Sequence, residues 1–206
     1  MSKSNNIAWG ITLLAAAGAY LIWRQGRKDT TPSLINNNDM NQYYPQYDFL
    51  QYRRLPRGYR NNNPLNIIYD ANKDGKADNN WNGQIGLEPE GRFSQFVDIV
   101  HGYRAALVLL RGRGYINGGN NTIRRIITKF APDNENYTEG YIINVSKLTG
   151  IEPDAVLSRN DKDKLTRIVY AMSIIENGYK DQDKNDIQAN YGLPSMDIIN
   201  LAWDIM

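Results

Sequence analysis

Residues 7–23 form a run of 17 amino acids without a charged side chain, IAWGITLLAAAGAYLIW. A segment of this length and apolarity is at the short end of what crosses a bilayer as a helix. Its Trp and Tyr residues lie near both ends, as is typical of membrane interfaces, and a cluster of basic residues follows: Arg24, Arg27 and Lys28. Because only Lys3 and the amino terminus precede the run, we expect a single-pass anchor with the rest of the chain on the cytoplasmic side. Cleavage as a signal peptide at Ala17-Gly18-Ala19 is the alternative.

The chain divides into three parts. Residues 1–29 are assigned to the anchor and its basic flank. Residues 30–55 form a linker rich in Asn, Gln, Pro and Tyr, without a hydrophobic period. Residues 56–206 contain enough aliphatic and aromatic side chains for one domain.

Composition narrows the chemistry of that domain. The chain has no cysteine, which excludes disulfides. His101 is its single histidine, so a Ser-His-Asp triad could be built only on that residue, and a zinc site rich in histidine is not expected. The net charge is +2 with both signs mixed, so we expect no nucleic-acid partner. Carboxylates remain as the main acid–base groups.

Hydrophobic periodicity predicts an α+β domain that is mostly helical, with one small antiparallel β element near its start. Residues 57–67 and 70–80 are expected to be loops, and two short β segments follow Trp81, the clearer one at residues 92–97. Helical patterns begin at Asp98 and at Thr122, which is an N-cap residue. Further helices are expected at residues 138–148, 161–175 and 197–205, with a single helical turn at residues 154–158.

Glu176 lies in an unusual position for a glutamate. It continues the apolar stripe of the helix at residues 161–175, which is made by Leu165, Ile168, Val169, Met172 and Ile175. Partial burial raises the pKa of a carboxyl group, and a proton donor of a glycosidase needs such a pKa. The alternative is a glutamate that ends a helix, with its head in water and Gly178 as the C-cap.

The loop that starts at Asp70 has the spacing of a calcium-binding loop. Asp70, Asn72, Asp74, Gly75 and Asp78 match positions 1, 3, 5, 6 and 9 of such a loop. Position 12 is a tryptophan rather than the bidentate glutamate, so two interpretations remain: weak calcium binding, or a turn rich in Asn, Asp and Gly. No cofactor is otherwise expected.

Several stretches resemble phage and prophage proteins described as virion structural proteins or predicted peptidoglycan hydrolases of lysozyme-like type. These stretches occur in the same order and cover about residues 57–180: RGYRNNNPLNI, WNGQ, RFSQF, HGYRAALVLL, NTIRRIITKFAPDNENYTEGYIINVSKLTG and IIENG. The resemblance implies a lysozyme-like domain that acts on peptidoglycan.

The segment Ile174–Gly178 is also similar to the helix-Glu-Ser-Gly element of goose-type lysozymes, lytic transglycosylases and bacterial glucosaminidases. In the glucosaminidases, segments like Asn63–Ile67 and Trp81–Gly83 follow the glutamate, whereas here they precede Glu176. This order suggests a circularly permuted lysozyme-like core, which is plausible because domain termini often lie close together.

The resemblance implies roles for particular residues. Glu176 would protonate the glycosidic oxygen, and Glu135 is the second candidate acid, with stabilisation of a helix N-terminus as its alternative role. Candidate sugar contacts are Asn63, Trp81, Tyr137 and Tyr141.

Two functions follow from these observations. The first is a membrane-anchored, virion-associated muramidase or lytic transglycosylase that cleaves the β-1,4 glycan of the host wall during phage entry. The second is a non-catalytic virion protein that links an internal membrane to the capsid. The expected partners are peptidoglycan strands, a lipid bilayer and, for the second function, capsid proteins. The expected location is the virion membrane, derived from the host cytoplasmic membrane.

Overall fold

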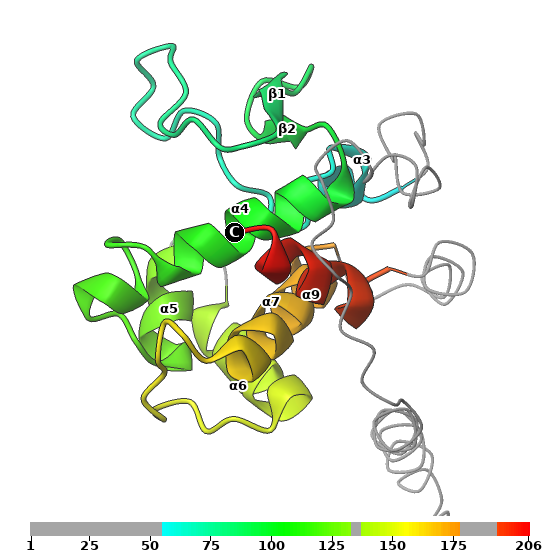
Figure 1. Ribbon diagram of the computed structural model, residues 1–206. Coiled ribbons are helices and arrows are strands. Elements are labelled where there is room, and N and C mark those ends of the chain that lie inside the picture. Colours follow the sequence, from blue (N-terminus) through cyan, green and yellow to red (C-terminus); the bar gives the residue numbers. More distant parts are fainter. Residues whose placement is uncertain (1–54, 133–136, 178–192) are drawn as a thin grey trace, which may run out of the picture. The chain divides into compact units, whose positions relative to one another are not determined.

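The computed structural model describes residues 55–132, 137–177 and 193–206 (Figure 1). The expected anchor at residues 7–23, nearly all of the linker, Glu135 and Gly178 lie outside these ranges. Within the described ranges, no helix is both long enough and apolar enough to cross a bilayer.

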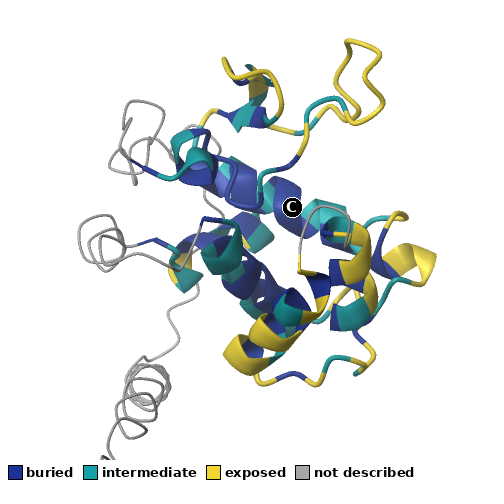
Figure 2. Ribbon diagram, turned by 180° about the vertical axis from the view of Figure 1, so that it is seen from behind, coloured by how far each residue is buried: buried dark blue, intermediate teal, exposed yellow. Residues whose placement is uncertain are grey.

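Helix α4 (Ile99–Arg111) is the centre of the domain. The carboxylate of Asp98 accepts a hydrogen bond from the backbone N–H of His101 at 2.9 Å, which confirms the predicted helix start. One side of α4 faces the β strands, and the other packs on the helices α7 (Lys162–Glu176) and α9 (Met196–Asp204) (Figure 1). Most residues of α4 are buried, as Figure 2 shows, because elements cover it on both sides.

The other helices follow the predicted pattern closely. After the short 3-10 helix η2 (Ile116–Gly118) come α5 (Ile123–Phe130) and α6 (Thr138–Thr149). Thr122 caps α5 as predicted, and α6 ends at Gly150 in the left-handed conformation. The helical turn expected at residues 154–158 is absent: this loop has only a turn at its start.

The predicted β element is a two-stranded antiparallel sheet. Strand β1 (Gln84–Leu87) pairs with β2 (Ser94–Phe96), and Ile68 forms an isolated bridge with Phe93 beside them. The α+β class is therefore confirmed.

The segment at residues 57–67 begins with a helix that the sequence does not predict. Residues Arg57–Arg60 form the single turn α3, which is too short to produce a hydrophobic period. Asn61, Asn62 and Asn63 follow, and all three are buried. Gly102 of α4 lies directly against the carbonyl oxygen of Asn62, where any side chain would collide, so the segment sits on the backbone of α4.

Candidate functional site

The C-terminal end of α7 is held by buried polar groups. Ser173 Oγ lies 3.1 Å from the hydroxyl oxygen of Tyr59 and 2.9 Å from that of Tyr103. Burial raises the pKa of both tyrosines, so their hydroxyls stay neutral and act as hydrogen-bonding groups. This contact joins α7 to α3 and α4 one turn before Glu176.

Asn177, the residue after Glu176, binds three backbone groups around the end of α7. Its side-chain oxygen accepts the N–H of Tyr59 at 3.2 Å, and its Nδ2 donates to the carbonyl oxygens of Pro64 and Ser173 at 2.9 and 2.8 Å. The side chain therefore satisfies backbone groups of three segments at once. As a result, the end of α7 lies against the loop at residues 61–67.

Two hydrogen bonds hold the carboxylate of Glu176. The hydroxyl of Tyr141, on α6, donates to Oε1 at 2.9 Å. The Nδ2 of Asn66 donates to Oε2 at 3.2 Å and to the backbone oxygen of Glu176 at 3.3 Å. The carboxylate is thus placed between helix α6 and the loop at residues 61–67.

The pKa of Glu176 is raised above its ordinary value. Burial is the largest cause, and it outweighs the bonds from Asn66 and Tyr141, which favour the charged form. Among the described residues, no charged side chain contributes to this shift. Glu176 therefore keeps its proton to a higher pH than a surface glutamate, as a general acid requires.

Asn66 has a further feature beside this carboxylate. Its Oδ1 is buried and has no hydrogen-bond partner, although its Nδ2 is engaged. Its backbone φ of 50° lies in the left-handed region, which asparagine adopts more readily than most residues. From the sequence, Asn66 is marked only as part of the segment Asn63–Ile67. The sequence around Asn66, an asparagine after Pro64-Leu65, is also typical of an ordinary turn, so it does not indicate a residue that contacts Glu176.

The predicted sugar contacts have different surroundings. Asn63 is fully buried, and its amide donates to the backbone oxygens of Ile67 and Ser94 at 2.9 Å, so it stabilises the loop itself. Trp81 is partly exposed, and Tyr137 is 80% exposed with its ring over Gly140. Tyr141 is buried and bonded to Glu176. Of these four, only Tyr141 is hydrogen-bonded to the carboxylate of Glu176.

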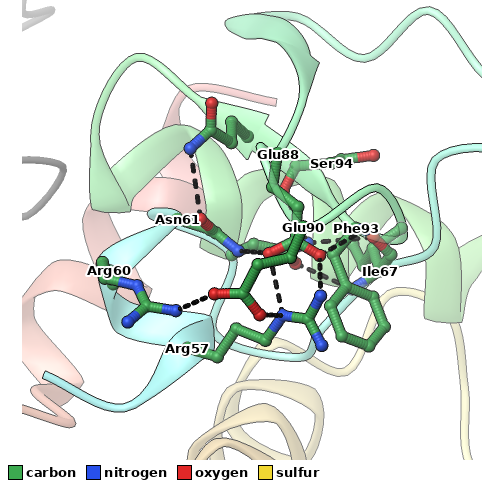
Figure 3. A network of polar contacts seen from close by, with 10 residues as sticks. Arg57, Arg60, Asn61, Ile67, Glu88, Glu90, Phe93 and Ser94 are labelled. Carbon is green, nitrogen blue, oxygen red and sulfur yellow. Dashed lines mark hydrogen bonds and ion pairs between the residues drawn. The ribbon is translucent and has the colours of Figure 1, made fainter. Parts of the chain in front are cut away.

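The largest polar network near this loop was missed by the sequence analysis. Glu88 is 3% exposed and accepts two hydrogen bonds from the guanidinium of Arg57, at 2.8 and 2.5 Å (Figure 3). It also accepts Nδ2 of Asn61 at 2.5 Å and the backbone N–H of Phe93 at 2.8 Å. At the surface, Glu90 lies 2.7 Å from Arg60. These bonds join α3 to the turn between β1 and β2, and no local pattern links partners about 30 residues apart.

The loop at residues 70–78 is ordered by its own carboxylates. Asp70 accepts the backbone N–H groups of Asp74 and Gly75 at 3.1 and 2.7 Å. Asp78 accepts the N–H of Ala71 at 2.6 Å and Nδ2 of Asn72 at 2.7 Å. Within the described residues, no group of three acidic or histidine side chains is arranged to hold a metal ion. Calcium binding by this loop stays a prediction.

Comparison with known proteins places the chain in a family. No protein-family profile matches the sequence. The chain is 36% identical over 141 residues to protein P5 of Pseudoalteromonas phage PM2, and the match covers 68% of this chain and 83% of that protein. At this identity and coverage, the chain belongs to the family of that phage protein.

Proposed function

We propose that this chain is a membrane-anchored protein of a phage virion that cleaves the β-1,4 glycan of peptidoglycan, with Glu176 as the general acid. The observation that carries the proposal is the half-buried carboxyl of Glu176, whose pKa is raised and whose two oxygens are oriented by Tyr141 and Asn66. The family relationship to a phage protein agrees with a role in the virion.

The chemistry requires little beyond this carboxyl. Glu176 donates its proton to the glycosidic oxygen while the bond from that oxygen to the anomeric carbon breaks. In a lysozyme-like transglycosylase, a hydroxyl of the same sugar then bonds to that carbon and gives its proton to the carboxylate of Glu176, so a second carboxylate is not needed. This route suits a site in which Glu176 is the only acid identified among the described residues. The exposed ring of Tyr137 and the partly exposed ring of Trp81 are candidate sugar contacts.

The remaining parts of the proposal come from the sequence. The uncharged run at residues 7–23 spans the virion membrane once, with the domain on the cytoplasmic side during assembly. In that position the domain cannot reach the host wall before infection. The lysozyme-like core is circularly permuted, which agrees with the bonds from Asn177 to Pro64 and from Asn66 to Glu176.

A non-catalytic role is the second candidate, and one observation favours it. Both oxygens of Glu176 are already bonded within the protein, to Tyr141 and to Asn66, as they would be if Glu176 only joined α7 to its neighbours. In that case the domain links an internal membrane to the capsid.

The experiment that separates the two candidates uses purified peptidoglycan. The full chain in detergent is incubated with it, and soluble fragments are analysed by chromatography and mass spectrometry. The proposed enzyme releases glycan fragments, and fragments that have lost one water at the cleaved end identify a transglycosylase. If no fragment is released at any pH tested, the structural role is correct.

A further inference from the structure

One stretch of the domain contains only positive charges. Residues 99–132 include six Arg or Lys residues and no Asp or Glu, although the charge of the whole chain is nearly balanced. The stretch covers α4, η2 and α5, which fold back on one another. The overall composition conceals this asymmetry, because the acidic residues lie elsewhere in the chain.

The fold gathers four exposed cations at one end of the domain, which we call the basic edge: Arg113, Arg125, Lys129 and Arg159. Lys129 lies 5.5 Å from the ring centre of Tyr115, and Arg125 donates to the carbonyl oxygen of Gly119 at 3.1 Å. Both therefore lie beside the turn around η2, which also includes Arg113.

Arg159 joins this group from the loop between α6 and α7. The backbone oxygen of Arg159 accepts a hydrogen bond from Nε of Arg111 at 2.8 Å. Burial is the main cause that lowers the pKa of Arg111, and the positive charge of Arg159 is the second. The loop is held to the same end of the domain because the backbone N–H of Leu157 donates to the carbonyl oxygen of Asn121 at 2.8 Å. The turn around η2 and this loop lie at the same end in Figure 1.

Little negative charge opposes the basic edge. Among the described residues, none of its four members forms an ion pair. The nearby acids Asp154 and Glu139 are bonded to Arg124, at 3.1 and 2.9 Å. The loop has two other acids: Asp161 lies 3.2 Å from Nζ of Lys164, and Glu152 is exposed. The four cations are therefore available to an anionic partner.

An exposed aliphatic side chain lies in the same loop. Val156 is 71% exposed, the largest exposure of any large aliphatic residue in the described ranges. It precedes Leu157, whose N–H donates to the carbonyl oxygen of Asn121. An exposed aliphatic group in a loop that also contains Arg159 suits the boundary between lipid headgroups and acyl chains. It offers no ring on which a nucleic-acid base could stack.

We propose that the basic edge and Val156 form a second membrane-contact surface, which binds the phosphate groups of anionic phospholipids and holds the domain against the bilayer. Clusters of four or more cations are attracted to anionic bilayers, by about fivefold in the binding equilibrium for each cation near the surface. The proposal rests on the proposed membrane location but not on catalysis by Glu176. A failed peptidoglycan assay therefore leaves it unaffected.

The absence of cysteine allows a direct test on the full chain. Single variants Val156→Cys and Ile85→Cys are labelled with a fluorophore and reconstituted into nanodiscs that contain brominated lipids, which quench on contact. Ile85 is 55% exposed on β1 and serves as the control position. A third label, at Gly18→Cys, reports whether the expected anchor is inserted.

The expected result is quenching at position 156 in nanodiscs with phosphatidylglycerol, little quenching there with phosphatidylcholine alone, and none at position 85. Salt at about 1 M, where the Debye length is about 3 Å, should release the domain. Arg113→Gln with Arg159→Gln should shift the equilibrium away from the bilayer by about 30-fold. The exposed pair Lys73→Gln with Lys76→Gln should not shift it.

Three outcomes would overturn the proposal. One is equal quenching at positions 156 and 85, and another is quenching at position 156 that does not depend on phosphatidylglycerol. The third is a response of the label at position 156 to duplex DNA without any response to anionic lipid, which would make the basic edge a nucleic-acid surface. The label at position 18 separates this proposal from the proposed membrane location. If that label is quenched in both lipids, the anchor is inserted, and any of the three outcomes then contradicts the basic edge alone.

Discussion

Removal of Arg57 tests the buried network that holds α3 to the β strands. Arg57→Ala leaves Glu88, which is 3% exposed, with only the neutral donors of Asn61 and the Phe93 backbone. Deleting one partner of a buried ion pair costs about 3–5 kcal/mol, because the other charge stays buried without compensation. The side chain of Arg57 is 32% exposed, so we expect a loss near the lower end, about 3 kcal/mol.

The pH dependence of this loss follows from the pKa of Glu88. Burial alone raises that pKa, but the bonds from Arg57, Asn61 and Phe93 outweigh it, so the net shift is downward from 4.5. A carboxyl whose pKa is lowered by folding stabilises the native state above its unfolded pKa, and this contribution disappears as the pH falls. The difference between Arg57→Ala and the unaltered protein should therefore be full at pH 7 and shrink below 4.5.

The assay is chemical denaturation of both proteins at several pH values, followed by tryptophan fluorescence. Arg60→Ala is the matched control, because among the described residues Arg60 pairs only with Glu90, which is 54% exposed. A pair of this kind contributes less than about 1 kcal/mol. If the two variants lose the same free energy of unfolding at pH 7, the buried network does not stabilise the domain more than the exposed pair does.

Four further predictions concern Glu176, the end of α7 and the loop at residues 70–78. Tyr141→Phe removes a bond that favours ionised Glu176, so the pKa of Glu176 should rise further in a carbon-13 NMR titration, and an unchanged value would contradict the assigned contact. Because folding raises this pKa, the free energy of unfolding should decrease as the pH rises above 4.5, and more steeply in that variant. Asn177→Ala removes three hydrogen bonds to buried backbone groups. It should lower the free energy of unfolding, measured by denaturation, by about 1.5–4.5 kcal/mol. A smaller loss would mean that other contacts hold the end of α7. The loop at residues 70–78 should bind calcium only weakly by calorimetry, and no heat and no change in melting temperature at millimolar calcium would remove that prediction.

Local signals in the sequence predicted the five longer helices of the described residues, although they missed the single turn α3 and wrongly predicted a helical turn at residues 154–158. Asp98 and Thr122 are side chains that accept backbone N–H groups at helix starts, and Gly150 adopts the left-handed conformation at a helix end. The apolar stripe that includes Glu176 predicted a partly buried carboxyl, because the position of a residue on a helix face depends only on its spacing.

The contacts between distant segments could not be predicted in the same way. Tyr141 was predicted as a sugar contact, which stays a prediction, but its bond to Glu176, 35 positions away, was not predicted. Glu88 and Arg57 are 31 positions apart in elements too short to show a period. Such pairs depend on how the elements pack, and the pattern within each element carries no information about its partner.

The central claim is that Glu176 donates the proton that breaks the glycan, and one measurement tests it most directly. Release of soluble glycan fragments from purified peptidoglycan is compared for the unaltered chain, Glu176→Gln and the exposed control Glu152→Gln. Glu176→Gln keeps the shape of the side chain but cannot donate an acidic proton, so the rate should fall by about 10²–10⁴ while Glu152→Gln stays active. Full activity of Glu176→Gln, or loss of activity in Glu135→Gln instead, would contradict the account.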